Sequence, residues 1–298
     1  MILVTGVSGA LGGLVYRGLS ALDGVDAIPG TRTPGARTPD ARTARRIDFD
    51  DPATLTEGFA GVDVLVLISA GYAEDDIVMA RHDAAAEAAA AAGIRHVIYT
   101  SLAASGDHTT LAAPHRWTES RLSRSPFTTT VLRNGLYAEL LGALSSQSAA
   151  RAAETGVFEA AYGSTGRMSV VARQDLADVT VRVAAESDRA LAADTPTPHA
   201  NRTYELEGAT ALGGEDIADL LTKHHGTPIT YHPTTLTSTR AALLTQPLEP
   251  YQMTHTLSLL SNTAAGFLAS GHSDLPELLG TAPRRVHDLV VDAALSPR

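Results

Sequence analysis

The sequence contains no cysteine and a single lysine, Lys223. Without cysteine the chain has neither a disulfide framework nor a thiolate nucleophile. The scarcity of lysine removes this residue type from most of the active sites that the chain could form.

The formal net charge is −10 and no segment gathers basic residues, which argues against a nucleic-acid-binding surface. No apolar run approaches the roughly 18 residues of a membrane-spanning helix. We read no signal peptide before the first predicted strand, so we expect a cytoplasmic protein.

Buried strands alternate with helices in the first half of the 298 residues. Near-continuous apolar runs at 62–69, 96–101 and 128–133 are typical of strands that are covered on both faces of a parallel sheet. An alanine-rich segment, 76–92, lies between the first two runs and ends at Gly93, which predicts a helix with a glycine cap. This alternation predicts an α/β fold with a doubly wound parallel sheet, the Rossmann architecture.

The opening MILVTGVSGALGG places glycines three residues apart directly after a short apolar strand. In a strand–turn–helix setting, Gly6 permits the tight turn, Gly9 lets the backbone approach a pyrophosphate, and Gly12 allows the helix to pack closely on the strand. The pyrophosphate then lies on free N–H groups at the start of the helix. The pattern predicts a dinucleotide site, and the alternative is a structural turn that binds no ligand.

The residue after the second strand indicates which dinucleotide binds. NAD-binding domains usually place Asp or Glu there, to hold the ribose 2′-hydroxyl. Here Arg32 follows the predicted strand 26–29, with no carboxylate directly after that strand. A guanidinium suits a 2′-phosphate, which favours NADP as the cofactor. The alternative is an ordinary solvated arginine at the surface.

Several segments together resemble one family, the NmrA-like atypical short-chain dehydrogenase/reductases, and within it the NADPH-dependent quinone oxidoreductase type. The segments that carry the resemblance are the glycine-rich opening, Arg32, 48–51, 99–101 and 133–137. The ending at 278–280 with Pro283 is similar to the Leu-x-Gly-Arg-x-Pro ending of that family, although Thr281 stands where arginine is usual.

The resemblance implies a set of cofactor-binding residues at the carboxyl ends of the strands, where open α/β sheets place ligands. The residues around the pyrophosphate would be Gly6, Ser8, Gly9, Ala10, Leu11 and Gly12. The residues around the 2′-phosphate and the adenine would be Arg32, Asp48 and Phe49. The residues on the nicotinamide side would be Ser69, Ala70, Gly71, Ser101, Asn134 and Tyr137.

The Tyr-x-x-x-Lys pair of short-chain dehydrogenases is missing at the expected place. The chain has His115 and Glu119 there, four residues apart and therefore on one face of a helix, similar to the His-x-x-x-Glu of NmrA-like proteins. His115 could act as an acid or orient the substrate, or it could simply cap a helix or form the wall of a pocket. The catalytic candidates are His115, Asn134 and Tyr137, and no metal site is predicted.

We expect a Rossmann domain that binds NAD(P) at 1–150 and a smaller α/β substrate-binding subdomain at 151–298, with some of its segments returning to the Rossmann sheet. The expected activity is hydride transfer from NADPH to a quinone or a similar electrophile, because positioning over the nicotinamide could suffice for such an acceptor. Two alternatives stay open: a non-catalytic NADP(H) sensor, and a tailoring reductase of imines or enones. The expected partner is a small-molecule substrate rather than a nucleic acid or a membrane, and a homodimer is kept open.

Overall fold

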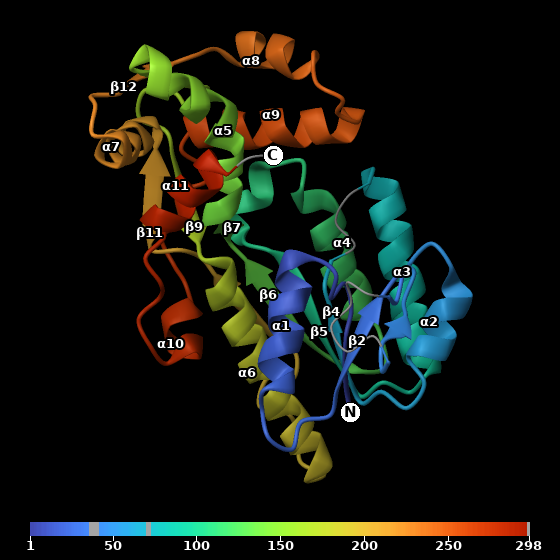
Figure 1. Ribbon diagram of the computed structural model, residues 1–298. Coiled ribbons are helices and arrows are strands. Elements are labelled where there is room, and N and C mark those ends of the chain that lie inside the picture. Colours follow the sequence, from blue (N-terminus) through green and yellow to red (C-terminus); the bar gives the residue numbers. More distant parts are fainter. Residues whose placement is uncertain (36–41, 70–72, 297–298) are drawn as a thin grey trace. The chain divides into compact units, whose positions relative to one another are not determined.

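The computed structural model describes residues 1–35, 42–69 and 73–296. The chain divides into two compact units, each of which is described by itself (Figure 1). The first unit comprises Met1–Ser101, Ala113–Asn134 and Gln174–Tyr204. The second unit comprises Leu102–Ala112, Gly135–Arg173 and Glu205–Arg298. The chain therefore passes more than once between the units, and the division into domains at residue 150 stays a prediction.

Seven strands of the described residues form one sheet, in the order β10-β6-β5-β4-β1-β2-β3. The pairs β1–β2, β1–β4, β4–β5 and β2–β3 are parallel. The strands are β1 (Ile2–Val4), β2 (Ala27–Thr31), β3 (Arg45–Arg46), β4 (Val64–Leu67), β5 (His96–Leu102), β6 (Thr128–Asn134) and β10 (Arg202–Leu206). The strand order reverses beside β1, and in sheets of this kind the crevice at such a switch point is where ligands bind. The predicted Rossmann fold is confirmed.

Helices cover both faces of this sheet (Figure 1). Those of the first unit are α1 (Ala10–Ser20), α2 (Pro52–Gly58), α3 (Asp75–Ala91), α4 (Ala112–Leu122) and α6 (Arg173–Ala192). Helices α2, α3 and α4 pack on one face, where Leu55, Ala85 and Leu122 join a core with Leu65 and Tyr99 from the strands. Alanines suit α3 because small side chains let it lie close to the sheet, and the helix ends just before Gly93, which has a φ of +71°.

The second unit has its own small sheets and its own core. A three-stranded sheet contains β11 (Thr210–Gly213), β9 (Arg167–Val171) and β7 (Leu136–Tyr137), and a two-stranded sheet contains β12 (Thr230–Pro233) and β8 (Val157–Ala160). Its helical elements are η1 (Ala104–His108), α5 (Ala138–Thr155), α7 (Gly214–His225), α8 (Leu236–Leu243), α9 (Pro250–Ala264), α10 (Leu275–Leu279) and α11 (His287–Leu295). Leu141, Phe158 and Leu260 belong to the buried core of this unit. Among the described residues no helix is both long and apolar enough to cross a membrane.

Candidate functional site

The turn between β1 and α1 has the conformation that its glycines predict. Gly6 has a φ of +64°, a left-handed value that favours glycine. The N–H of Gly9 donates to the carbonyl of Gly6 at 2.9 Å, which closes the turn. At Gly12 a Cβ atom would lie only 2.4 Å from the Gly6 carbonyl oxygen, so any side chain there would separate α1 from the turn. The glycine spacing therefore brings the helix N-terminus directly onto the end of β1.

Hydrogen bonds fix this turn between the two neighbouring strands. The N–H of Ile68, just beyond β4, donates to the Thr5 hydroxyl at 2.9 Å, and the N–H of Val7 donates to the carbonyl of Gly30 in β2 at 3.2 Å. Ser8 and Gly9 remain exposed at the start of α1. An exposed helix N-terminus presents N–H groups to an anion, so this turn can hold a pyrophosphate.

A cavity of about 360 Å³ lies beside this turn in the first unit. Its lining comes from the ends of four parallel strands and from α3, and comprises Gly6, Ser8, Gly9, Arg32, Ile47, Asp48, Phe49, Asp50, Ile68, Ser69 and Arg81. Seven of these eleven residues are among those that the family resemblance implies for the cofactor. The structure thus brings together one pyrophosphate turn, one guanidinium at the end of β2, and the segment after β3.

Two arginines line this cavity, and they differ in their surroundings. Arg81 donates to both carboxylate oxygens of Asp50, each at 2.7 Å, and this hydrogen-bonded pair holds the pKa of Asp50 below its usual value. Arg32 is exposed and lines the cavity beside Ser8, whose hydroxyl lies 3.4 Å from that of Thr31. A positive-φ glycine turn, close helix packing and a guanidinium at the end of β2 fit a dinucleotide that carries a 2′-phosphate.

The pair formed by Arg81 and Asp50 was not predicted as part of the site. The two residues are 31 positions apart, and Arg81 lies within an alanine-rich helix that shows no binding motif. The contact arises because α3 packs against α2, directly before which Asp50 lies, and no local pattern indicates this packing. Leu11 and Gly12, which the resemblance implies for the cofactor, are buried and do not line the cavity. Their role is to pack the start of α1 behind the turn.

Of the residues predicted for the nicotinamide side, some lie in the first unit, one lies in the second, and two lie outside the described residues. Ser101 is buried at the end of β5 and donates to Glu119 at 2.5 Å. Asn134 is buried at the end of β6, and its side-chain oxygen has no hydrogen-bond partner among the described residues. Ala70 and Gly71 lie outside the described residues. Tyr137 belongs to the second unit, where the Arg173 guanidinium lies 4.8 Å from the centre of its ring.

His115 and Glu119 lie on one helix, α4, but have different partners. The Nδ1 atom of His115 is 2.8 Å from the hydroxyl of Tyr99. Glu119 instead accepts from Arg133 at 2.6 Å and from Arg116 at 2.7 Å. The carboxylate is therefore occupied by two guanidinium groups and the Ser101 hydroxyl, and the histidine is oriented by a tyrosine.

Glu119 should make the protein sensitive to acid. Burial works to raise the pKa of Glu119, but the hydrogen bonds from Arg133 and Ser101 outweigh it and hold the pKa below its ordinary value of 4.5. The folded state therefore gains stability from this carboxylate above pH 4.5 and loses it as the pH falls through the lowered value.

We expect Glu119→Gln to lower the melting temperature at pH 7 by about 3–6 °C, because Arg133 and Arg116 lose their charged partner. The acid limb of the variant should also be flatter below pH 4.5. Thermal melts between pH 3 and 7 measure both effects. Glu57→Gln, which changes an exposed carboxylate on α2, is the control. Equal acid limbs in the wild type and Glu119→Gln would contradict the assignment.

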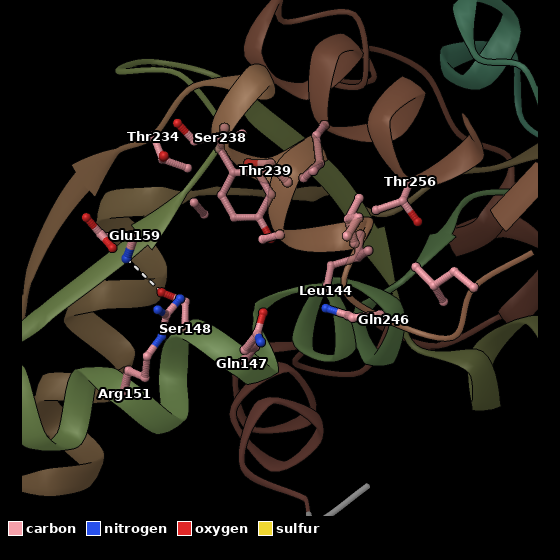
Figure 2. Close-up of a pocket in the computed structure, with 17 residues that line it drawn as sticks. Leu144, Gln147, Ser148, Arg151, Glu159, Thr234, Ser238, Thr239, Gln246 and Thr256 are labelled. Carbon is pink, nitrogen blue, oxygen red and sulfur yellow. Dashed lines mark hydrogen bonds between the residues drawn. The ribbon is translucent and has the colours of Figure 1, made fainter. Parts of the chain in front are cut away.

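The second unit contains a separate cavity of about 370 Å³ (Figure 2). It lies among α5, β8, α8 and α9, and no predicted site residue lines it. Gln147 and Gln246 contribute side-chain amides to its wall, and Leu144 and Leu260 contribute apolar surface. Tyr162 lies in this wall and is buried, with its hydroxyl 3.0 Å from that of Ser145.

Residues 6–187 match a protein family that is described as NAD(P)H-binding. The chain belongs to this family. It is 34% identical over 236 residues to quinone oxidoreductase 2 of Escherichia coli, a match that spans 78% of this chain and 77% of that protein. The predicted class is confirmed: the protein is an NAD(P)H-dependent oxidoreductase.

Two solved structures have the same fold as this chain. An NADPH-dependent quinone oxidoreductase from Escherichia coli in complex with NADPH is 30% identical, with a TM-score of 0.83 over 97% of this chain and 98% of that chain. NmrA, a negative transcriptional regulator in complex with NADP, is 12% identical with a TM-score of 0.69 over 98% of this chain and 94% of that one, which shows a shared fold. The predicted NmrA-like resemblance and the NADP(H) cofactor are thereby confirmed, while the roles of individual site residues stay predictions.

Proposed function

We propose that the protein transfers hydride from NADPH to a quinone or a similarly electrophilic small molecule. The observation that carries this proposal is that His115, a predicted catalytic residue, is paired with a tyrosine rather than with a carboxylate, its Nδ1 lying 2.8 Å from the Tyr99 hydroxyl. Burial lowers the pKa of His115 to about 4, and burial raises the pKa of Tyr99 above its usual value. At neutral pH this pair therefore offers hydrogen bonds rather than an easily released proton.

A quinone suits such a site because it needs little help with protonation. Bound NADPH supplies the hydride, which carries two electrons. The reduced quinone is an anion whose charge is delocalised over its ring, so it can take its proton from water after the transfer. An ordinary ketone would form a localised alkoxide and would need a proton donor in the transition state. The named relative that reduces quinones supports the same acceptor class.

The chain's own groups would then act by binding and orienting. The exposed turn at Ser8 and Gly9 would hold the pyrophosphate, and Arg32 would hold the 2′-phosphate. Because NADH lacks the 2′-phosphate, the protein would bind NADPH more tightly than NADH. The unpartnered side-chain oxygen of Asn134 can accept a hydrogen bond from an amide such as the nicotinamide carboxamide. These contacts would place the reacting carbon without any residue changing its protonation state.

The test is anaerobic oxidation of NADPH, followed at the nicotinamide absorbance, with small benzoquinones and naphthoquinones and with NADH in parallel. Saturable, quinone-dependent oxidation that prefers NADPH is the expected result. Tight NADPH binding without turnover on any quinone would overturn the proposal, and would favour a cofactor sensor or a reductase of imines or enones instead.

A further inference from the structure

Tyr99 and His115 form a hydrogen-bonded pair inside the first unit. Tyr99 lies on β5 and is completely buried, whereas His115 lies on α4 and is half-buried. The tyrosine hydroxyl is 2.8 Å from Nδ1 of the imidazole. One ring nitrogen is thus hydrogen-bonded inside the unit, and the other, Nε2, makes no hydrogen bond among the described residues, which leaves it available to a ligand.

Burial is the main cause that keeps the imidazole of His115 neutral. Burial and the neighbouring Arg116 lower the pKa of His115, and Glu119 on the same helix only partly opposes them. From α3, His82 faces the same cluster, and burial lowers its pKa to about 3, so it adds no proton. A neutral imidazole carries one N–H, and which nitrogen bears it depends on the partner of the other.

The hydrogen bonds around Tyr99 decide the direction of its own bond. The Thr118 hydroxyl lies 2.7 Å from the carbonyl of Pro114 and donates to it, because a carbonyl only accepts. Thr118 therefore has no proton left for Tyr99 and can itself accept from His82, whose Nδ1 lies 2.7 Å away. The Tyr99 hydroxyl also interacts with the side chains of Thr118 and Ser69. Among these neighbours the imidazole nitrogen is the most basic acceptor, and a phenol is a more acidic donor than a neutral imidazole N–H, so Tyr99 donates to Nδ1 of His115.

We propose that Tyr99 holds His115 as the neutral tautomer protonated on Nε2, and that this N–H donates a hydrogen bond to the acceptor oxygen on which charge develops. His115 is then a catalytic residue that keeps its proton throughout, and Tyr99 is a positioning residue. The inference rests on the proposed hydride transfer to a quinone. In that reaction NADPH becomes NADP⁺, the quinone gains the hydride and becomes the hydroquinone anion, and water supplies the remaining proton.

The tautomer can be read without any substrate. In the full-length protein, ¹⁵N NMR of labelled histidines distinguishes Nε2–H from Nδ1–H, and the His115 signals are identified by their loss in His115→Gln. We expect Nε2–H in the wild type and a mixture of tautomers in Tyr99→Phe. A wild-type signal from Nδ1–H overturns the proposal even if quinone turnover is observed.

Kinetics test the role of the N–H donor. We expect kcat with a quinone to be flat between pH 6 and 8, about 10- to 100-fold lower in His115→Ala, and largely restored in His115→Gln, whose amide also donates. Tyr99→Phe should lower kcat about two- to ten-fold with unchanged binding of NADPH. The matched control is Tyr204→Phe, since Tyr204 makes another tyrosine–histidine pair in this unit, its hydroxyl 3.0 Å from Nδ1 of His199.

The outcomes separate this inference from the proposed function. If no quinone is reduced but the Nε2–H tautomer is found, the proposed acceptor fails and the orienting role of Tyr99 stands. If quinones are reduced but His115→Gln is as slow as His115→Ala, or kcat falls as the pH rises from 6 to 8, the neutral donor is wrong and an imidazolium acid takes its place.

Discussion

Gly9→Val should abolish NADPH binding and leave the chain folded. Gly9 precedes the first residue of α1 and is exposed, and a Cβ atom there would lie 3.2 Å from the Gly6 carbonyl, a tight contact that a small shift relieves. The two valine methyl groups would extend from the turn into the space that the pyrophosphate needs. Because every phosphate contact of this turn would be lost together, we expect binding to weaken at least about 100-fold.

Equilibrium titration with NADPH measures this loss, and thermal unfolding shows whether the fold is intact. Gly271→Val is the matched control, because a Cβ atom at Gly271 meets nothing within 4 Å. Gly12→Val should behave differently from both: its Cβ atom would lie 2.4 Å from backbone, so the variant should lose stability as well as binding. Normal NADPH affinity in a folded Gly9→Val variant would place the cofactor elsewhere.

Arg32→Ala should convert a protein that prefers NADPH into one that hardly discriminates. Arg32 lines the cavity at the end of β2, and Asp50, an acidic residue of the same lining, is already bonded to Arg81. A guanidinium–phosphate contact is a charge-assisted hydrogen bond, and its loss should weaken NADPH about 10- to 100-fold. NADH lacks the 2′-phosphate, so its affinity should change less than about two-fold.

Titrations of both dinucleotides at two salt concentrations provide the measurement. The NADPH preference of the wild type should shrink as salt screens the phosphate, whereas the variant should show little salt dependence. Arg17→Ala removes an exposed arginine from α1 outside the cavity lining and serves as the control. Equal weakening of NADPH and NADH in Arg32→Ala would contradict recognition of a 2′-phosphate by this residue.

Local patterns were sufficient for the framework of the site. The apolar run 62–69 predicted β4, and a helix expected at 76–92 is α3 over Asp75–Ala91. Glycines at 6, 9 and 12 indicated the turn, and the structure shows why two of them tolerate no side chain without strain or displacement. These features are readable from sequence because each depends on residues within one turn or one strand.

Spacing alone did not predict which groups pair. The interval between His115 and Glu119 correctly puts both on one helix face, yet Tyr99 orients the histidine and Arg133 and Arg116 hold the carboxylate. Tyr99 and Arg133 come from neighbouring strands on either side of α4 in the chain. Whether they approach α4 depends on how this helix packs on the sheet. The spacing of residues along a single helix gives no information about that packing.

The sequence by itself determined the parallel sheet, the dinucleotide turn and the arginine after β2, because buried runs, glycine spacing and strand-end residues act locally. Only the tertiary structure decided that Arg81 is bonded to Asp50, that Glu119 is enclosed by arginines, and that the half-buried His115 is paired with a buried tyrosine. Protonation states follow from burial and from partners far along the chain, so the chemistry of His115 emerges only when β5 and α4 are packed together.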